Sequence, residues 1–82
     1  MADVAPRLQR FWTRRNRVLL VLDDLRQQID DWFLDPEATV PTMHKLAELE
    51  GLLAERKSLL GDLVKLDDEM LETLVTIRGS DS

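Results

Sequence analysis

The chain has 82 residues, a formal net charge of −5, three glycines, three prolines and no cysteine. This length allows one domain with a thin core, and the absence of cysteine excludes disulfides, thiolate zinc sites and a cysteine nucleophile. A lone histidine, His44, cannot form a multi-histidine metal site, and the longest purely apolar run, residues 18–22, is far shorter than the roughly 20 residues of a membrane span. Because no secretory signal is recognisable either, we expect an intracellular, cytoplasmic protein that uses no cofactor and no metal.

The first predicted element is a helix over about residues 6–34, a stretch that has no glycine or proline after Pro6. Its apolar residues follow the alternating three- and four-residue spacing of a packing seam, which Arg15 interrupts. The seam consists of Leu8, Phe11, Val18, Leu22, Leu25, Ile29 and Trp32. A second apolar row runs beside it at multiples of seven and consists of Trp12, Leu19 and Phe33.

A short connection over residues 35–41 follows, bounded by two prolines. Asp35, Pro36 and Glu37 have the form of an N-cap, a proline at the first helical position and an acid in the first turn. The sequence therefore predicts a single helical turn before the second long helix begins near Pro41 or Thr42.

The second predicted helix covers about residues 42–78, with Gly79 as its stop and residues 79–82 as a flexible polar tail. Arg56 and Asp67 interrupt its seam. We assign to that seam Leu46, Leu49, Leu53, Leu60, Leu63, Met70, Leu74 and Ile77. Further apolar rows flank it, one formed by Leu52, Leu59 and Leu66, the other by Val64 and Leu71.

Two long helices joined by so short a connection predict an all-α fold, a single antiparallel helical hairpin resembling a coiled coil. The flanking rows would remain in contact with water in one hairpin, so we expect assembly into a helical bundle, most simply a four-helix homodimer. If the chain folds back about residue 38, Arg15 lies near Gly61, and Asp67 lies near Arg7 and Arg10. Three interpretations of the seam charges stay open. They fix register and partner number, or Arg15 and Arg56 line a groove for an acidic ligand or partner, or the register differs by a residue or two and these side chains extend to solvent.

Residues 7–17 hold five of the eleven basic residues, and four of these share one helical face. We call Arg7, Arg10, Arg14 and Arg17 the arginine stripe. It can pair with the acidic residues between Asp62 and Glu72, contact an acidic protein or an anionic membrane surface, or track a nucleic-acid backbone beside Phe11 and Trp12. A net charge of −5 disfavours nucleic acid, because it repels the phosphates at long range.

Two family resemblances bear on function. The run from Leu49 to Leu66, with its Leu-Leu-Ala-Glu-Arg-Lys-Ser-Leu-Leu core, is similar to the leucine-rich helix of small flagellar and type III export chaperones. This resemblance implies that the chain holds an amphipathic helix of another protein. The segments Leu25–Asp30 and Leu52–Lys57 resemble two signatures of the all-helical chorismate mutases, which implies substrate-binding roles for Arg26 and Arg56. In that family a lysine occupies the position that Asp67 takes here, and an aspartate there would repel the dicarboxylate substrate.

No catalytic triad, phosphate loop or metal-ligand cluster can be assembled from these residues, so we expect a non-enzymatic interaction protein: an adaptor, an export chaperone or a small subunit of a complex. Its expected partner is an amphipathic helix or an acidic surface. A nucleic-acid-binding helical dimer and a helical mutase are the alternatives. The expected partner-binding residues are Arg7, Arg10, Phe11, Trp12, Arg14, Arg17, Leu19, Phe33, Leu52, Leu59 and Leu66.

Overall fold

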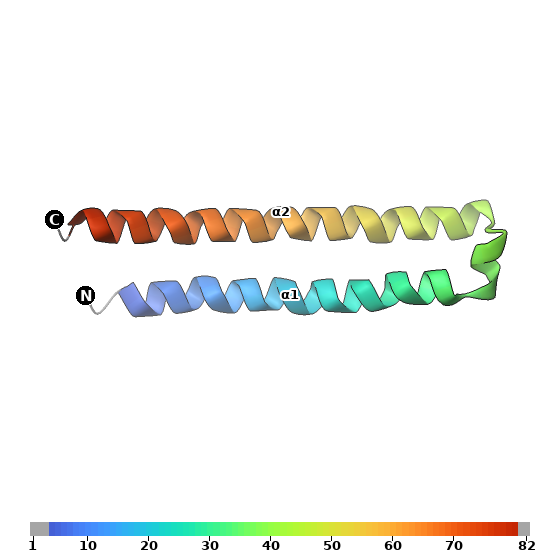
Figure 1. Ribbon diagram of the computed structural model, residues 1–82, viewed down its shortest axis with the longest axis horizontal. Coiled ribbons are helices and arrows are strands. Elements are labelled where there is room, and N and C mark those ends of the chain that lie inside the picture. Colours follow the sequence, from blue (N-terminus) through green and yellow to red (C-terminus); the bar gives the residue numbers. More distant parts are fainter. Residues whose placement is uncertain (1–3, 81–82) are drawn as a thin grey trace.

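The computed structural model describes residues 4–80 and shows an extended antiparallel hairpin of two long helices (Figure 1). Helix α1 covers Val4–Leu34, the short 3-10 helix η1 covers Pro36–Thr39, and helix α2 covers Met43–Ser80. The prediction of an all-helical hairpin is therefore confirmed. The hairpin is a thin rod of 62 × 15 × 13 Å, and its radius of gyration is 18.7 Å. A compact domain of this length has a radius of gyration of about 12 Å.

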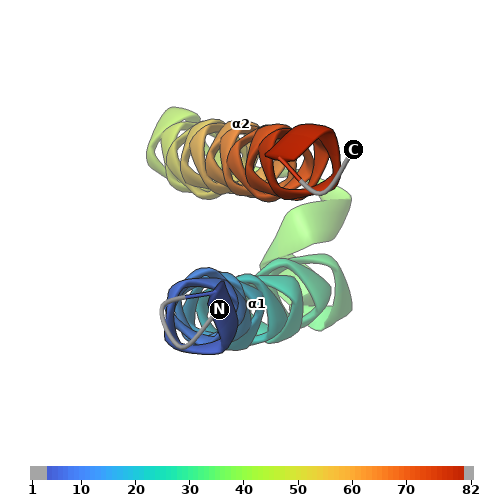
Figure 2. The ribbon, with the colours of Figure 1, turned by 90° about the vertical axis from the view of Figure 1, so that its left-hand side faces the viewer.

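The turn forms as the sequence predicts, with one helical turn between the two long helices. The Asp35 carboxylate accepts a hydrogen bond from the Glu37 amide at 2.9 Å and so caps η1. Thr42 caps α2 in the same way, since its hydroxyl accepts from the Lys45 amide at 3.1 Å. Seen end-on, the helices that the turn joins are inclined to each other (Figure 2).

Side chains from both helices hold the turn closed. The Trp32 indole donates to the Lys45 carbonyl at 2.8 Å, and the Lys45 ammonium lies 2.9 Å from a carboxylate oxygen of Asp35. The Glu37 amide, followed by the Lys45 side chain, lowers the pKa of Asp35 below its ordinary value, because both stabilise the carboxylate. The hydrogen bond to Asp35 in turn raises the pKa of Lys45. These contacts fix the register at the closed end of the hairpin.

The predicted α1 seam faces α2 along its whole length. Its members are all buried or half-buried, including Arg15, while their neighbours on the outer face of α1 are exposed. Leu25 and Trp32 are the most enclosed, at 2% and 6% exposure. Among residues 6–79 the only other hydrophobic residue this buried is Leu66, which confirms that a single hairpin has a thin core.

The predicted α2 seam is wrong in half of its positions. Leu49, Leu63, Met70 and Ile77 do face α1, but the row formed by Leu46, Leu53, Leu60 and Leu74 is exposed. Its place is taken by the row formed by Leu52, Leu59 and Leu66, which we expected on an outer face. Each of these two leucine rows completes a heptad repeat with the four seam residues that do face α1. Spacing alone therefore cannot show which leucine row faces α1.

The predicted contacts of the seam charges are also wrong. Arg15 does not lie opposite Gly61; its guanidinium lies 3.1 Å from the Asp67 carboxylate, so Asp67 is paired with Arg15 rather than with Arg7 or Arg10. Side chains on a helix lean toward its N-terminus, which carries the guanidinium of Arg15 toward the open end of the hairpin.

Gly79 does not end α2, since the helix continues through it to Ser80. No residue among 4–80 has a positive φ, so the glycine makes no left-handed cap there. The last two residues of the predicted tail lie outside the described part of the chain.

Candidate functional site

The exposed apolar side chains gather on one side of the rod. The rows that flank the seam on this side come from both helices, because Leu19 of α1 and Leu60 of α2 line one shallow depression between them. We call this surface the apolar side. The seven-residue rows of these two residues, together with the adjoining row of Val64, place on it ten of the fifteen large hydrophobic residues that are exposed among residues 6–79: Trp12, Leu19, Phe33, Met43, Leu46, Leu53, Leu60, Val64, Leu71 and Leu74.

The amount of exposed surface is large for a chain of this mass. The hairpin exposes 6575 Å², whereas a folded monomer of 9.5 kDa exposes about 5000 Å². The excess is therefore about 1500 Å², and a standard protein–protein interface buries about 800 Å² per partner. A surface of this size is sufficient for a specific interface.

Charged residues interrupt the apolar side, and some of them are paired within the hairpin. Glu50, Lys57 and Arg78 share the seven-residue row of Val64 and make no ion pair within residues 4–80. Asp67 pairs with Arg15, whose guanidinium also lies 5.4 Å from the centre of the Trp12 ring. Arg26 pairs with Asp23 at 3.1 Å. Arg56, which lines the same depression as Arg26, makes no ion pair with any of residues 4–80.

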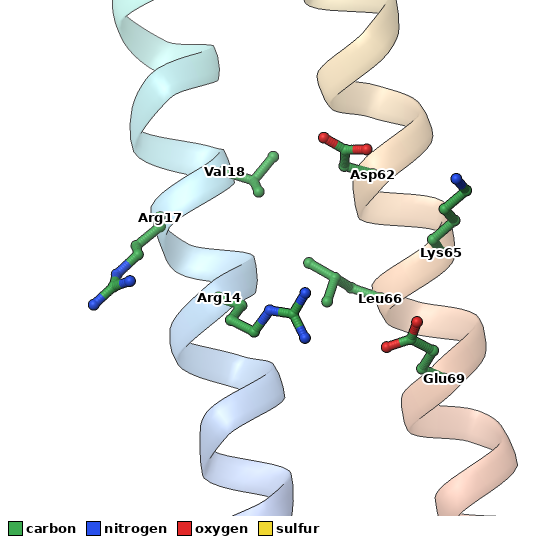
Figure 3. Close-up of a pocket in the computed structure, with 7 residues that line it drawn as sticks. All are labelled: Arg14, Arg17, Val18, Asp62, Lys65, Leu66 and Glu69. Carbon is green, nitrogen blue, oxygen red and sulfur yellow. The ribbon is translucent and has the colours of Figure 1, made fainter.

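The opposite side of the seam is charged. Figure 3 shows a depression there that is lined by Arg14, Arg17 and Val18 of α1 and by Asp62, Lys65, Leu66 and Glu69 of α2. Arg14 reaches toward α2, whereas Arg17 points away from it. We call this surface the charged side. Acidic residues of α2 thus lie near the arginine stripe without enclosing it.

The arginine stripe lies exposed along α1 at the open end of the hairpin. Within the described residues, none of its four guanidinium groups comes within 4.0 Å of a carboxylate. Phe11, which we expected to join the stripe in binding, is half-buried in the seam and lines a second depression with Arg7, Arg10 and Arg14. The four cations are therefore open to an external anion.

The structure brings together some of the predicted site residues and separates others. Trp12, Leu19 and Phe33 are exposed on the apolar side, as expected of a flanking row. The prediction that Leu52, Leu59 and Leu66 form a partner-facing row is wrong in its placement, because these residues face α1 and Leu66 is only 6% exposed. The row formed by Leu46, Leu53, Leu60 and Leu74 takes this outer position, and the only sequence signal for it was its own seven-residue repeat.

The two residues named by the mutase resemblance lie on the apolar side. Arg26 and Arg56 line one depression with Leu19, Leu22, Asp23 and Leu60, and Arg26 is already paired with Asp23. Residues 4–80 contain no group of three side chains that could hold a metal ion, and no helix among them is long and apolar enough to cross a membrane. Comparison of the chain with protein-family models, with curated proteins and with solved structures finds no match.

Proposed function

We propose that this chain is a non-catalytic helical interaction module with two working surfaces. The apolar side packs against the apolar side of a second copy and completes a four-helix bundle. The arginine stripe, on the charged side, stays exposed in that bundle and contacts an acidic surface of a partner protein. The observation that carries the proposal is the concentration of exposed apolar residues on one side of the hairpin.

A second copy fits the apolar side in shape and in chemistry. A two-fold dimer places identical surfaces against each other, so an apolar face is automatically matched by an apolar face. About 65% of a homodimer interface is apolar, so burying about 800 Å² on each copy removes about 1000 Å² of apolar surface from water. At about 25 cal/mol per Å² of apolar surface, this contributes on the order of 25 kcal/mol before the costs of association and side-chain ordering. Two of the ion pairs on this side, Arg15 with Asp67 and Arg26 with Asp23, already exist within one hairpin, so these four charges do not enter the interface as isolated ions.

A pair of matched substitutions tests the dimer. Leu60 is 38% exposed on the apolar side, and Val21 is 43% exposed on the charged side. Leu60→Glu places a carboxylate in the middle of the proposed interface, whereas Val21→Glu adds the same charge where no second copy packs. We expect sedimentation equilibrium to show a dimer for the wild type and for Val21→Glu, and a helical monomer for Leu60→Glu.

Circular dichroism of each variant separates loss of assembly from loss of folding. A wild-type chain that stays monomeric at high micromolar concentration contradicts the proposed dimer. A dimer that survives Leu60→Glu unchanged shows that a different surface is used.

The arginine stripe supports a second contact, with an acidic protein surface. Four guanidinium groups at helical spacing project from α1, and none has a carboxylate partner within residues 4–80. Guanidinium groups bind carboxylates through paired, charge-assisted hydrogen bonds. Nucleic acid is the alternative ligand for such a stripe, although the net charge of −5 opposes it.

Charge reversal tests this contact, with poly-glutamate and a DNA duplex as the two probes. We expect the wild type to bind poly-glutamate and Arg10→Glu/Arg14→Glu to lose that binding. A matched control lowers the net charge by the same four units at exposed sites outside the stripe and off the apolar side, and should retain the binding. Its substitutions are Gln27→Glu, Ala47→Glu, Ala54→Glu and Ser58→Glu. Binding of the duplex in preference to poly-glutamate, with an affinity that falls linearly on logarithmic axes as salt rises, would favour the nucleic-acid reading. No binding to either probe would leave the stripe without a role.

A further inference from the structure

The charge of the hairpin is distributed unevenly along the rod. The half that contains the turn, residues 23–57, carries nine acidic and four basic residues, a net charge of −5. The rest of the chain, whose described residues form the half that contains the open end, carries seven basic and seven acidic residues, a net charge of 0. Five of these seven basic residues belong to the first part of α1, and the start of α1 and the end of α2 lie together at this end of the rod (Figure 1).

Two hairpins can bring their apolar sides together about a two-fold axis in two ways. An axis along the rod leaves both turns at the same end of the dimer. An axis across the rod places the turn of one copy beside the open end of the other. Both arrangements bury the same apolar residues, so burial does not distinguish them.

We infer that the dimer is antiparallel, with the turn of each copy beside the open end of its partner; this inference rests on the dimer proposed above. A parallel dimer would place two halves of charge −5 together at one end, and like charges side by side oppose association. The antiparallel dimer instead places the half of charge −5 beside a half that belongs to a stretch of net charge 0 and contains five arginines of α1. Avoidance of the contact between two strongly acidic halves selects one orientation among those that bury equal apolar area.

The antiparallel dimer also sets where the arginine stripes lie. Each stripe belongs to the open end of its own copy, so the two stripes lie at opposite ends of the bundle. A parallel dimer would place both at one end. The orientation therefore decides whether the assembly presents one cationic end or two.

Distances between spin labels test this orientation. The chain has no cysteine, so a single introduced cysteine gives one label per copy. Thr39→Cys places the label on the exposed turn, and Ser58→Cys places it on an exposed site near the middle of α2. In the antiparallel dimer the Thr39 labels are separated by a distance close to the rod length of 62 Å, whereas the Ser58 labels, near the middle of the rod, are separated by a much shorter distance that the width of the dimer sets.

The possible outcomes separate the orientation from the dimer itself. Short distances at both sites mean that the dimer exists but is parallel, which overturns this inference and leaves the proposed assembly standing. The absence of any intermolecular distance at either site, together with a monomeric mass, overturns both. A long distance at the Thr39 site with a short one at the Ser58 site supports both.

Discussion

Truncation of Leu66 tests the corrected seam of α2. This leucine is 6% exposed, and its side chain points toward Val18 across the seam (Figure 3). Leu66→Ala removes three carbon atoms from that contact, at about 0.8 kcal/mol each. A residual cavity adds to the cost, but the rod is thin and water or neighbouring side chains can fill the space. We therefore expect a loss of about 2–3 kcal/mol, at the lower end of the range for buried leucines.

The assay is thermal and urea unfolding followed by circular dichroism, with all proteins at one concentration because assembly affects apparent stability. A loss of about 2–3 kcal/mol corresponds to a fall in Tm of about 10–20 °C for a chain of this length. Leu20→Ala is the matched control, since Leu20 is 71% exposed and its truncation should change stability by no more than about 0.5 kcal/mol. Equal effects of the two substitutions would refute the seam described above.

Three further predictions concern the turn and the helix interiors. Lys45→Gln should lower the free energy of unfolding, and the size of this loss should be constant at intermediate pH. It should shrink as the pH falls through the lowered Asp35 pKa, below 3.8, or rises through the raised Lys45 pKa, above 10.5; urea titrations across pH measure it. Trp32→Phe removes the donor to the Lys45 carbonyl and should cost about 1 kcal/mol, together with a repacking cost, in the same unfolding assay. Gly51→Ala and Gly61→Ala should each stabilise the chain by about 0.5–1 kcal/mol, because an added Cβ meets no atom within 4 Å at either helical site; an unchanged Tm would contradict this.

The α1 seam and the turn were predicted correctly because the nearby sequence is compatible with only one arrangement in each case. Residues of α1 outside the seam, apart from Trp12, Leu19 and Phe33, offer no competing apolar row with a seven-residue repeat. At the turn, Asp35 and Pro36 specify a cap and a helical turn through their own backbone chemistry. Lys45 was not recognised as a seam residue, because its role depends on Trp32 and Asp35, which become its neighbours only when the chain folds back.

The α2 seam could not be predicted from periodicity because two leucine rows share the same repeat. Leu53 and Leu52 each continue a heptad with Leu49 and Leu63, and the choice between them depends on the residues of α1 that lie opposite. With Leu52 inward, Leu53 lies on the side of the hairpin where α1 presents Leu19, so the remaining apolar rows adjoin. The sequence therefore predicted that α2 exposes a leucine row beside its seam. It assigned the wrong leucine row of α2 to that exposed position.

The mass of the unmodified chain in solution tests the central claim most directly. Sedimentation equilibrium over a range from low to high micromolar concentration measures it without any substitution or label. If the apolar side is covered by a second copy, the mass is twice the chain mass of 9.5 kDa at the upper concentrations and falls toward 9.5 kDa on dilution. A mass of 9.5 kDa at every concentration, with the helices intact by circular dichroism, would contradict the claim that this surface exists to pair the hairpin with itself.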